Sequence, residues 1–207
     1  MTWLMALDYA SVFVFSLSGG LAASRKQLDV IGFAFIACLT ALGGGTVRDL
    51  LLDRNPVFWI EDPTNIAAAL VGAALIYFIG PKIENRLHIL LRFDAVALAV
   101  ASAAGLGIAI SVGYVGPIAI LMAMITATFG GLLRDVVCNE IPLVLRHREL
   151  YVSAAFAGAL AGLGLWHVIG DSLWVFGVTI GVTWALRMGS ISFGLRLPGP
   201  AHPPARR

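Results

Sequence analysis

The chain has 207 residues, of which 59% are hydrophobic and only 13% charged, and its mean hydropathy is +0.89. Soluble domains carry about 25% charged residues, so this composition excludes an ordinary soluble domain and predicts an integral membrane protein. The net charge of +2 says little by itself, and we expect no nucleic-acid partner.

Seven apolar segments are long enough to cross a bilayer as helices, which takes roughly 20 residues. In chain order they cover residues 4–23, 28–52, 63–81, two helices within 95–133, then 150–169 and 172–189. Residues 95–133 hold no Asp, Glu, Lys or Arg, and the turn signal Gly-Tyr-Val-Gly-Pro at 113–117 divides them. We therefore expect an all-α integral membrane fold, with one seven-helix domain over residues 1–190.

The end of the chain differs in composition from the spans. Residues 198–207 are rich in proline and arginine, so we expect a disordered cytoplasmic tail over residues 191–207. Arg187 lies near the end of the seventh span, where we expect its side chain to snorkel to the interface.

The basic residues are divided unequally between the two sides of the membrane. Seven spans place eleven of them on one side: Arg25, Lys26, Lys82, Arg86, Arg92, Arg146, Arg148, Arg187, Arg196, Arg206 and Arg207. The other side has only Arg54, plus Arg48 at a helix end. The positive-inside rule then predicts an inner (plasma) membrane protein with its N-terminus outside and its C-terminus in the cytoplasm.

The chain repeats itself at a constant offset of 86 residues, without a gap. The matching pairs are Asp8 with Asp94, Ser16 with Ser102, Gly19 with Gly105, Thr40 with Thr126, Gly44 and Gly45 with Gly130 and Gly131, Arg48 and Asp49 with Arg134 and Asp135, Pro56 with Pro142, and Gly72 with Gly158. Each copy, about 4–81 and about 90–169, holds three spans, so the second copy must enter the membrane upside down. Inverted repeats of this kind mark a transport site near the midplane. The seventh helix, about 172–189, lies outside the repeat, and we expect it to serve packing or assembly.

The repeated motif places a threonine, a glycine and an arginine on one helical face, four residues apart. The set consists of Thr40, Gly44 and Arg48 in the first copy and of Thr126, Gly130 and Arg134 in the second. Neighbouring glycines loosen a helix and can expose carbonyls to a wet cavity, so we expect broken, pore-lining helices at these sites. The alternative is close packing, because small residues let membrane helices approach.

Arg48 and Arg134 each stand next to an aspartate, Asp49 or Asp135. Adjacent helical residues do not face each other, so we expect each arginine to find its partner on another helix, with Asp8 and Asp94 as the repeat-matched candidates. These six residues are candidates for structural ion pairing and for charges in a pore, and the two roles do not exclude each other.

The remaining chemistry-bearing residues form no recognisable site. Cys38 and Cys138 lie in or beside apolar runs without a metal or disulfide spacing, and the four histidines are scattered. The glycine runs match no phosphate loop, and no nucleophile stands at a recognisable spacing from a base. We expect no cofactor, no metal site and no enzymatic activity.

The motifs Gly-Gly-Gly-Thr-Val-Arg-Asp at 43–49 and Gly-Gly-Leu-Leu-Arg-Asp at 130–135, within two inverted triplets plus a seventh helix, resemble the prokaryotic trimeric intracellular cation (TRIC) channel family. The resemblance covers about residues 4–189. It implies a homotrimer with an hourglass pore in each subunit for monovalent cations, chiefly potassium and also sodium. It also implies kinks in the second and fifth helices at Gly43, Gly44, Gly45, Gly130 and Gly131, and basic pore residues at Arg48 and Arg134.

Two further points qualify the resemblance. Phe129 stands where a third glycine would match Gly43, so the two kinks need not be equally sharp. Related bacterial sequences carry the label of a small-solute (glycine) transporter, and a secondary transporter of such a solute is the alternative function.

Overall fold

The structure is a computed structural model that describes residues 2–83, 85–145 and 149–195. The elements in these ranges are all helical: α1 (Thr2–Arg25), α2 (Val30–Leu51), α3 (Phe58–Glu61), α4 (Thr64–Ile79), η1 (Gly80–Lys82), α5 (Arg86–Ser111), α6 (Pro117–Val137), η2 (Leu143–Leu145), α7 (Val152–Ile169) and α8 (Leu173–Phe193). Seven of them are long and apolar enough to cross a membrane. The expected seven-span, all-helical fold is therefore confirmed.

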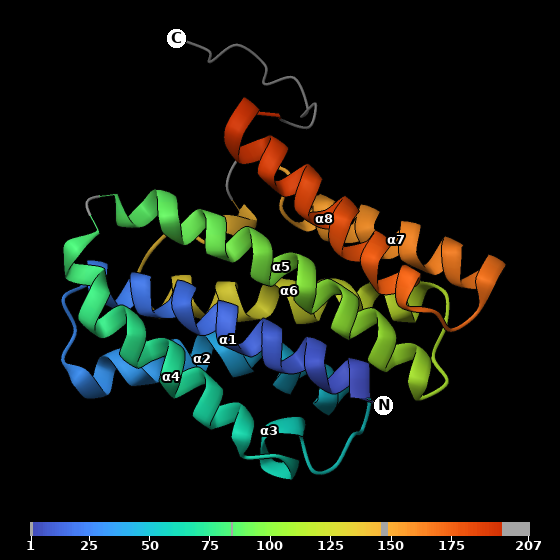
Figure 1. The fold of residues 1–207 in the computed structure, drawn as a ribbon, viewed down its shortest axis with the longest axis horizontal. Coiled ribbons are helices and arrows are strands. Elements are labelled where there is room, and N and C mark those ends of the chain that lie inside the picture. The colour runs from blue at the N-terminus through green and yellow to red at the C-terminus, as the bar shows by residue number, and fades with distance from the viewer. Residues whose placement is uncertain (1, 84, 146–148, 196–207) are drawn as a thin grey trace, which may run out of the picture.

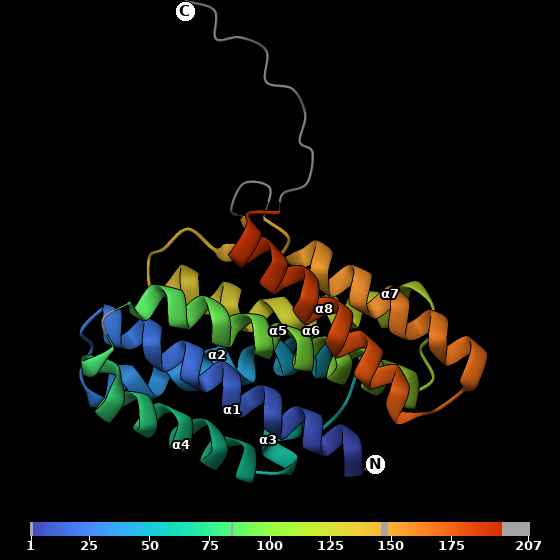
Figure 2. The same ribbon diagram turned by 45° about the horizontal axis from the view of Figure 1, so that its top comes forward.

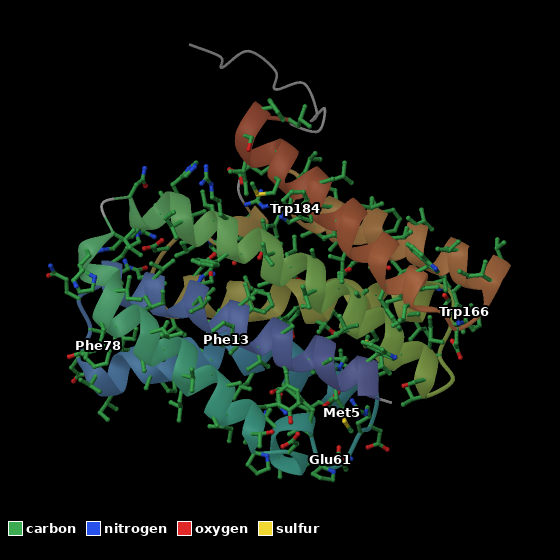
Figure 3. The ribbon with its side chains drawn as sticks, in the orientation of Figure 1. Met5, Phe13, Glu61, Phe78, Trp166 and Trp184 are labelled. Atoms are coloured by element: carbon green, nitrogen blue, oxygen red, sulfur yellow. The ribbon has the colours of Figure 1, made fainter. Side chains whose placement is uncertain are left out.

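The helices form two triplets, α1–α2–α4 and α5–α6–α7, in which α1 corresponds to α5, α2 to α6 and α4 to α7. Helices α1 and α5 pack side by side, and α2 and α6 pack together behind them (Figure 1). Helix α4 lies along one edge of the bundle, and α7 with α8 lies along the opposite edge (Figure 2). Met5 of α1 and Trp166 of α7 lie toward one end of the bundle, and Phe78 of α4 lies at the other (Figure 3).

Helix α5 begins earlier than the apolar pattern indicated. The charged residues between the apolar segments 63–81 and 95–133 belong in part to its first turns, which start at Arg86. The Asn85 side chain caps this start, and the Arg86 guanidinium donates to the carbonyl oxygens of Gly80 (2.9 Å) and Ser24 (3.1 Å). The helix can begin before the apolar segment because the cap and these hydrogen bonds satisfy polar groups at its first turn.

Helix α8 also extends further than expected, because residues 191–193, assigned to the tail, continue it to Phe193. The Ser190 hydroxyl donates to the carbonyl oxygen of Leu195 (2.9 Å) and accepts from the amide of Leu150 (3.1 Å), which ties this end to the start of α7. The rest of the expected tail, residues 196–207, lies outside the described residues.

The seventh helix changes the packing of the second triplet. In the first triplet, Gly72 of α4 lies against Ser16 of α1, whereas its repeat mate, Gly158 of α7, lies against Thr183 of α8. Helix α8 thus takes the position against α7 that α1 takes against α4. The two triplets are alike in their inner helices and differ at their outer edges.

Candidate functional site

Helices α2 and α6 cross at Gly44 and Gly130, and their backbones touch there. A Cβ atom built on Gly44 would lie 2.2 Å from the carbonyl oxygen of Thr126, and one built on Gly130 would lie 2.2 Å from that of Thr40. The Thr40 and Thr126 hydroxyls are turned back to carbonyls of their own helices, at 2.6 and 2.7 Å. Only glycine fits at either position, and the contact is the same from both sides.

The other motif glycines also face neighbours. Gly43 faces the side chain of Leu133, Gly45 faces the ring of Phe58, and Gly131 faces the hydroxyl of Tyr151. All five glycines, Gly43, Gly44, Gly45, Gly130 and Gly131, are buried.

Helices α2 and α6 run through these glycines without interruption. The expected break in each helix is therefore wrong for this structure, because the cost of glycine in a helix is offset by the close packing that it permits. A bend at these glycines and a pore-lining role for them, and for Thr40 and Thr126, stay predictions.

The first charged cluster surrounds Arg48, whose side chain is fully buried near the end of α2. Its Nη1 donates to Oδ1 of Asp8 on α1 at 2.9 Å, and its Nε donates to Oδ1 of Asp49 at 2.8 Å. Asp49 also accepts from Nη1 of Arg54 (3.0 Å) and from the amide of Phe58 (2.9 Å), and the Phe58 ring centroid lies 5.4 Å from the guanidinium carbon of Arg48. The connector after α2 thus folds back to complete the cluster.

The second cluster repeats this geometry around Arg134 of α6. Its Nη1 donates to Oδ1 of Asp94 on α5 at 2.7 Å and to the Ser18 hydroxyl, and its Nε donates to Oδ1 of Asp135 at 2.8 Å. Asp135 accepts from the amide of Leu143 at 2.9 Å, as Asp49 accepts from Phe58. The correspondence extends from the sequence repeat to individual hydrogen bonds.

These contacts confirm one prediction about the arginines and correct another. Asp8 and Asp94 are the expected partners on other helices. However, Arg48 also pairs with the adjacent Asp49, and Arg134 makes the equivalent pair, which we had excluded. The rule that adjacent residues do not face each other fails here because the long arginine side chain reaches around its own helix to the neighbouring carboxylate.

The two clusters differ in their access to solvent. The Asp8 side chain is 14% exposed and borders a cavity of about 790 Å³ that also includes Arg54, Ser111 and Asp171. The Asp94 side chain is fully buried. The cavity lies where α1 begins and α5 and α7 end, so the first cluster borders open space at that end of the bundle, whereas Asp94 of the second cluster does not.

Arg187 of α8 is a third buried arginine, which the sequence pattern did not indicate as an internal residue. Its side chain is fully buried instead of snorkelling, donates to Oε2 of Glu149 at 2.9 Å, and stacks 4.9 Å from the ring centroid of Tyr151. The available signal was the four-residue spacing of Thr179, Thr183 and Arg187, which forms one polar stripe facing α7.

Comparison with known proteins finds relatives over nearly the whole chain. A family model described as "Glycine transporter" matches residues 5–81 and again residues 91–167, which is the offset of the internal repeat. The inner membrane protein YadS of Escherichia coli, a UPF0126 protein, is 35% identical over 197 residues, covering 93% of each chain. A UPF0126 membrane protein of Vibrio cholerae is 36% identical over 202 residues, covering 94% of this chain and 82% of the relative.

Two solved structures resemble the fold. The TRIC trimeric intracellular cation channel orthologue of Rhodobacter sphaeroides superposes with a TM-score of 0.88 and 38% identity, over 94% of this chain and 100% of that one. A prokaryotic TRIC channel in 0.5 M KCl gives a TM-score of 0.87 and 26% identity, over 95% and 99%.

Proposed function

We propose, because the chain belongs to the prokaryotic TRIC channel family, that it is a cation channel of the bacterial plasma membrane. In finer terms, it conducts monovalent cations, chiefly potassium and also sodium, through a pore within each subunit of a homotrimer. The Rhodobacter sphaeroides relative is described as a trimeric cation channel, which supports both the ion sign and the assembly.

The observation that carries the proposal is the neutralisation of both motif arginines by aspartates. An unpaired arginine in the path would repel cations, whereas Arg134 faces two carboxylates, Asp94 and Asp135, at 2.7 and 2.8 Å. The formal charge of this cluster is negative, which favours cations over anions in a low-dielectric interior.

The proposed path runs between the two triplets. It enters from the cavity beside Asp8, passes the Arg48 cluster, narrows where α2 and α6 meet at Gly44, and leaves past the Arg134 cluster. The threonines of the motif and the exposed oxygen of Asp8 are the groups that would replace part of an ion's hydration shell.

Electrical recording tests the proposal directly. Purified protein in a planar bilayer with symmetric potassium chloride should give discrete current steps, and the reversal potential in a salt gradient should follow the cation. Arg134→Gln should change conductance or open probability without changing the cation preference, because it leaves the carboxylates in place. A reversal potential that followed chloride would refute the proposed ion sign.

The family model's description supports a second candidate, a secondary transporter of a small solute such as glycine. Inverted repeats serve transporters as well as channels. Saturable uptake of radiolabelled glycine into proteoliposomes, without current steps, would favour this candidate and contradict the proposal of a cation channel.

A further inference from the structure

Three charged side chains join the end of α1 to the connector after α6. Nη1 of Arg25 lies 3.0 Å from Oε2 of Glu140, and Nζ of Lys26 lies 3.5 Å from Oε1 of the same carboxylate. Arg25 is the last residue of α1, at the end of the bundle away from the N-terminus, and Glu140 follows the end of α6 at Val137 (Figure 2). We call Arg25, Lys26 and Glu140 the Glu140 bridge. It ties together segments that are 115 residues apart in the sequence.

The internal repeat shows what the same positions do at the opposite end of the bundle. The counterparts of the three bridge residues, 86 positions away in the sequence, are Ser111, Val112 and Arg54. All three line the cavity of about 790 Å³ beside Asp8. Ser111 and Val112 carry no charge that could pair with Arg54, which donates instead to Asp49 at 3.0 Å. One set of repeat positions therefore borders open space at one end and closes into an ion-paired contact at the other.

The bridge is built onto the second charged cluster. The Glu140 amide donates to the carbonyl oxygen of Asp135 at 2.8 Å, and the Asp135 carboxylate accepts from Arg134 at 2.8 Å. Between these two residues of the connector, Cys138 is buried in one apolar cluster with Leu21 of α1. The end of α1 thus covers the connector with apolar contacts inside and with the two ion pairs at the rim.

The strength of the bridge suits a contact that opens and closes. The side chains of Arg25, Lys26 and Glu140 are 27%, 35% and 20% exposed, so water and salt screen their attraction. Exposed ion pairs are weak and shift an equilibrium by at most roughly fivefold. The pair of Arg134 and Asp94 is different, because both side chains are fully buried and breaking such a pair costs far more. When this end of the bundle opens, the bridge is therefore the contact that yields first.

We propose that the Glu140 bridge is a latch, which holds α1 against the connector after α6 and so closes this end of the bundle over the Arg134 cluster. Opening the latch lets α1 move away from the connector and gives Asp94 the contact with open space that Asp8 has at the other end. In the proposed channel the latch is the gate at this end. That role rests on the proposed conduction, whereas the latch itself does not.

Cys138 reports the state of the latch, because the end of α1 covers it. The test variant carries Arg25→Gln and Lys26→Gln, and the matched control carries Lys82→Gln and Arg92→Gln, which remove two exposed positive charges outside the bridge. Each protein is purified in detergent and treated with N-ethylmaleimide, and alkylation of Cys138 is followed by peptide mass spectrometry. The test variant should react roughly two- to fivefold faster than wild type and the control. Loss of positive charge disfavours the thiolate, so a faster reaction reports opening of the latch and not activation of the thiol.

Wild type supplies a second measurement that needs no substitution. Raising the potassium chloride concentration screens the bridge, so Cys138 of wild type should react faster, while the variant that lacks both positive charges should change little. Equal alkylation rates in the three proteins, or a salt effect of the same size in wild type and the test variant, overturn the latch whatever currents are recorded.

Planar bilayers test the gate separately. The test variant should have a higher open probability than wild type, because its latch no longer holds. Faster alkylation of Cys138 with an unchanged open probability overturns the gate. Absence of current from every protein refutes the proposed function, and the alkylation rates then decide the latch by themselves.

Discussion

Alanine at Gly44 should force α2 and α6 apart. Its Cβ would lie 2.2 Å from the carbonyl oxygen of Thr126, where ordinary van der Waals contact begins near 3.4 Å, and a backbone oxygen cannot turn away. The helices must therefore separate by about 1 Å, and overpacking of this kind costs about 1–3 kcal/mol. Alanine recovers about 1 kcal/mol of helix propensity, so we expect a net loss of about 1 kcal/mol.

The neighbouring Gly43→Ala is the matched control, because it gains the same propensity in the same helix. Its Cβ would meet Cδ1 of Leu133 at 2.7 Å, and this side-chain tip can move. Thermal unfolding in detergent, followed by tryptophan fluorescence, should place the Gly44→Ala midpoint about 2–4 °C below wild type, since 1 kcal/mol corresponds to about 2–4 °C at this size. Gly43→Ala should melt at or above wild type. If Gly44→Ala and Gly43→Ala had the same melting midpoint, the assignment of Gly44 to a backbone contact would be refuted.

The same assay and simple labelling test three other features. Asp94→Asn should destabilise the protein more than Asp8→Asn, because the Asp94 side chain is fully buried and that of Asp8 is 14% exposed, and breaking a buried pair costs about 3–5 kcal/mol; equal losses would contradict the difference in hydration. Glu149→Gln should lower the melting midpoint by removing the carboxylate partner of the buried Arg187, and an unchanged midpoint would show that this pair is not stabilising. A membrane-impermeant maleimide should label Thr2→Cys in intact cells, with both native cysteines replaced by serine, if the N-terminus is outside; labelling only after lysis would reverse the orientation.

The spans and the repeat were readable in the sequence because both depend on patterns that survive without three-dimensional information. A helix that crosses hydrocarbon needs a long apolar run, and a constant offset of 86 residues aligns the two triplets. The cross-helix partners of Arg48 and Arg134 followed from the same offset, because Asp8 and Asp94 were the matched charges available.

The rest depended on geometry that spacing does not encode. Whether a glycine bends a helix or admits a neighbour depends on the partner surface, and for Gly44 that surface is the backbone of Thr126, 82 residues away in sequence. Likewise Arg187 looked like a snorkelling residue, because its acceptor Glu149 belongs to a connector whose path no periodicity reveals. Side-chain reach had the same effect at Arg48, which pairs with its own neighbour.

The joint between α2 and α6 has a consequence for how such a chain can arise. At this joint Gly44 meets the backbone at Thr126 and Gly130 meets the backbone at Thr40, so each half offers the other the face that it receives. A half-length protein carrying this face would be complementary to an upside-down copy of itself, as a two-fold dimer requires. After gene duplication and fusion, each half could change independently of the other. Gly43 and its repeat counterpart Phe129 mark a position at which the two halves have diverged.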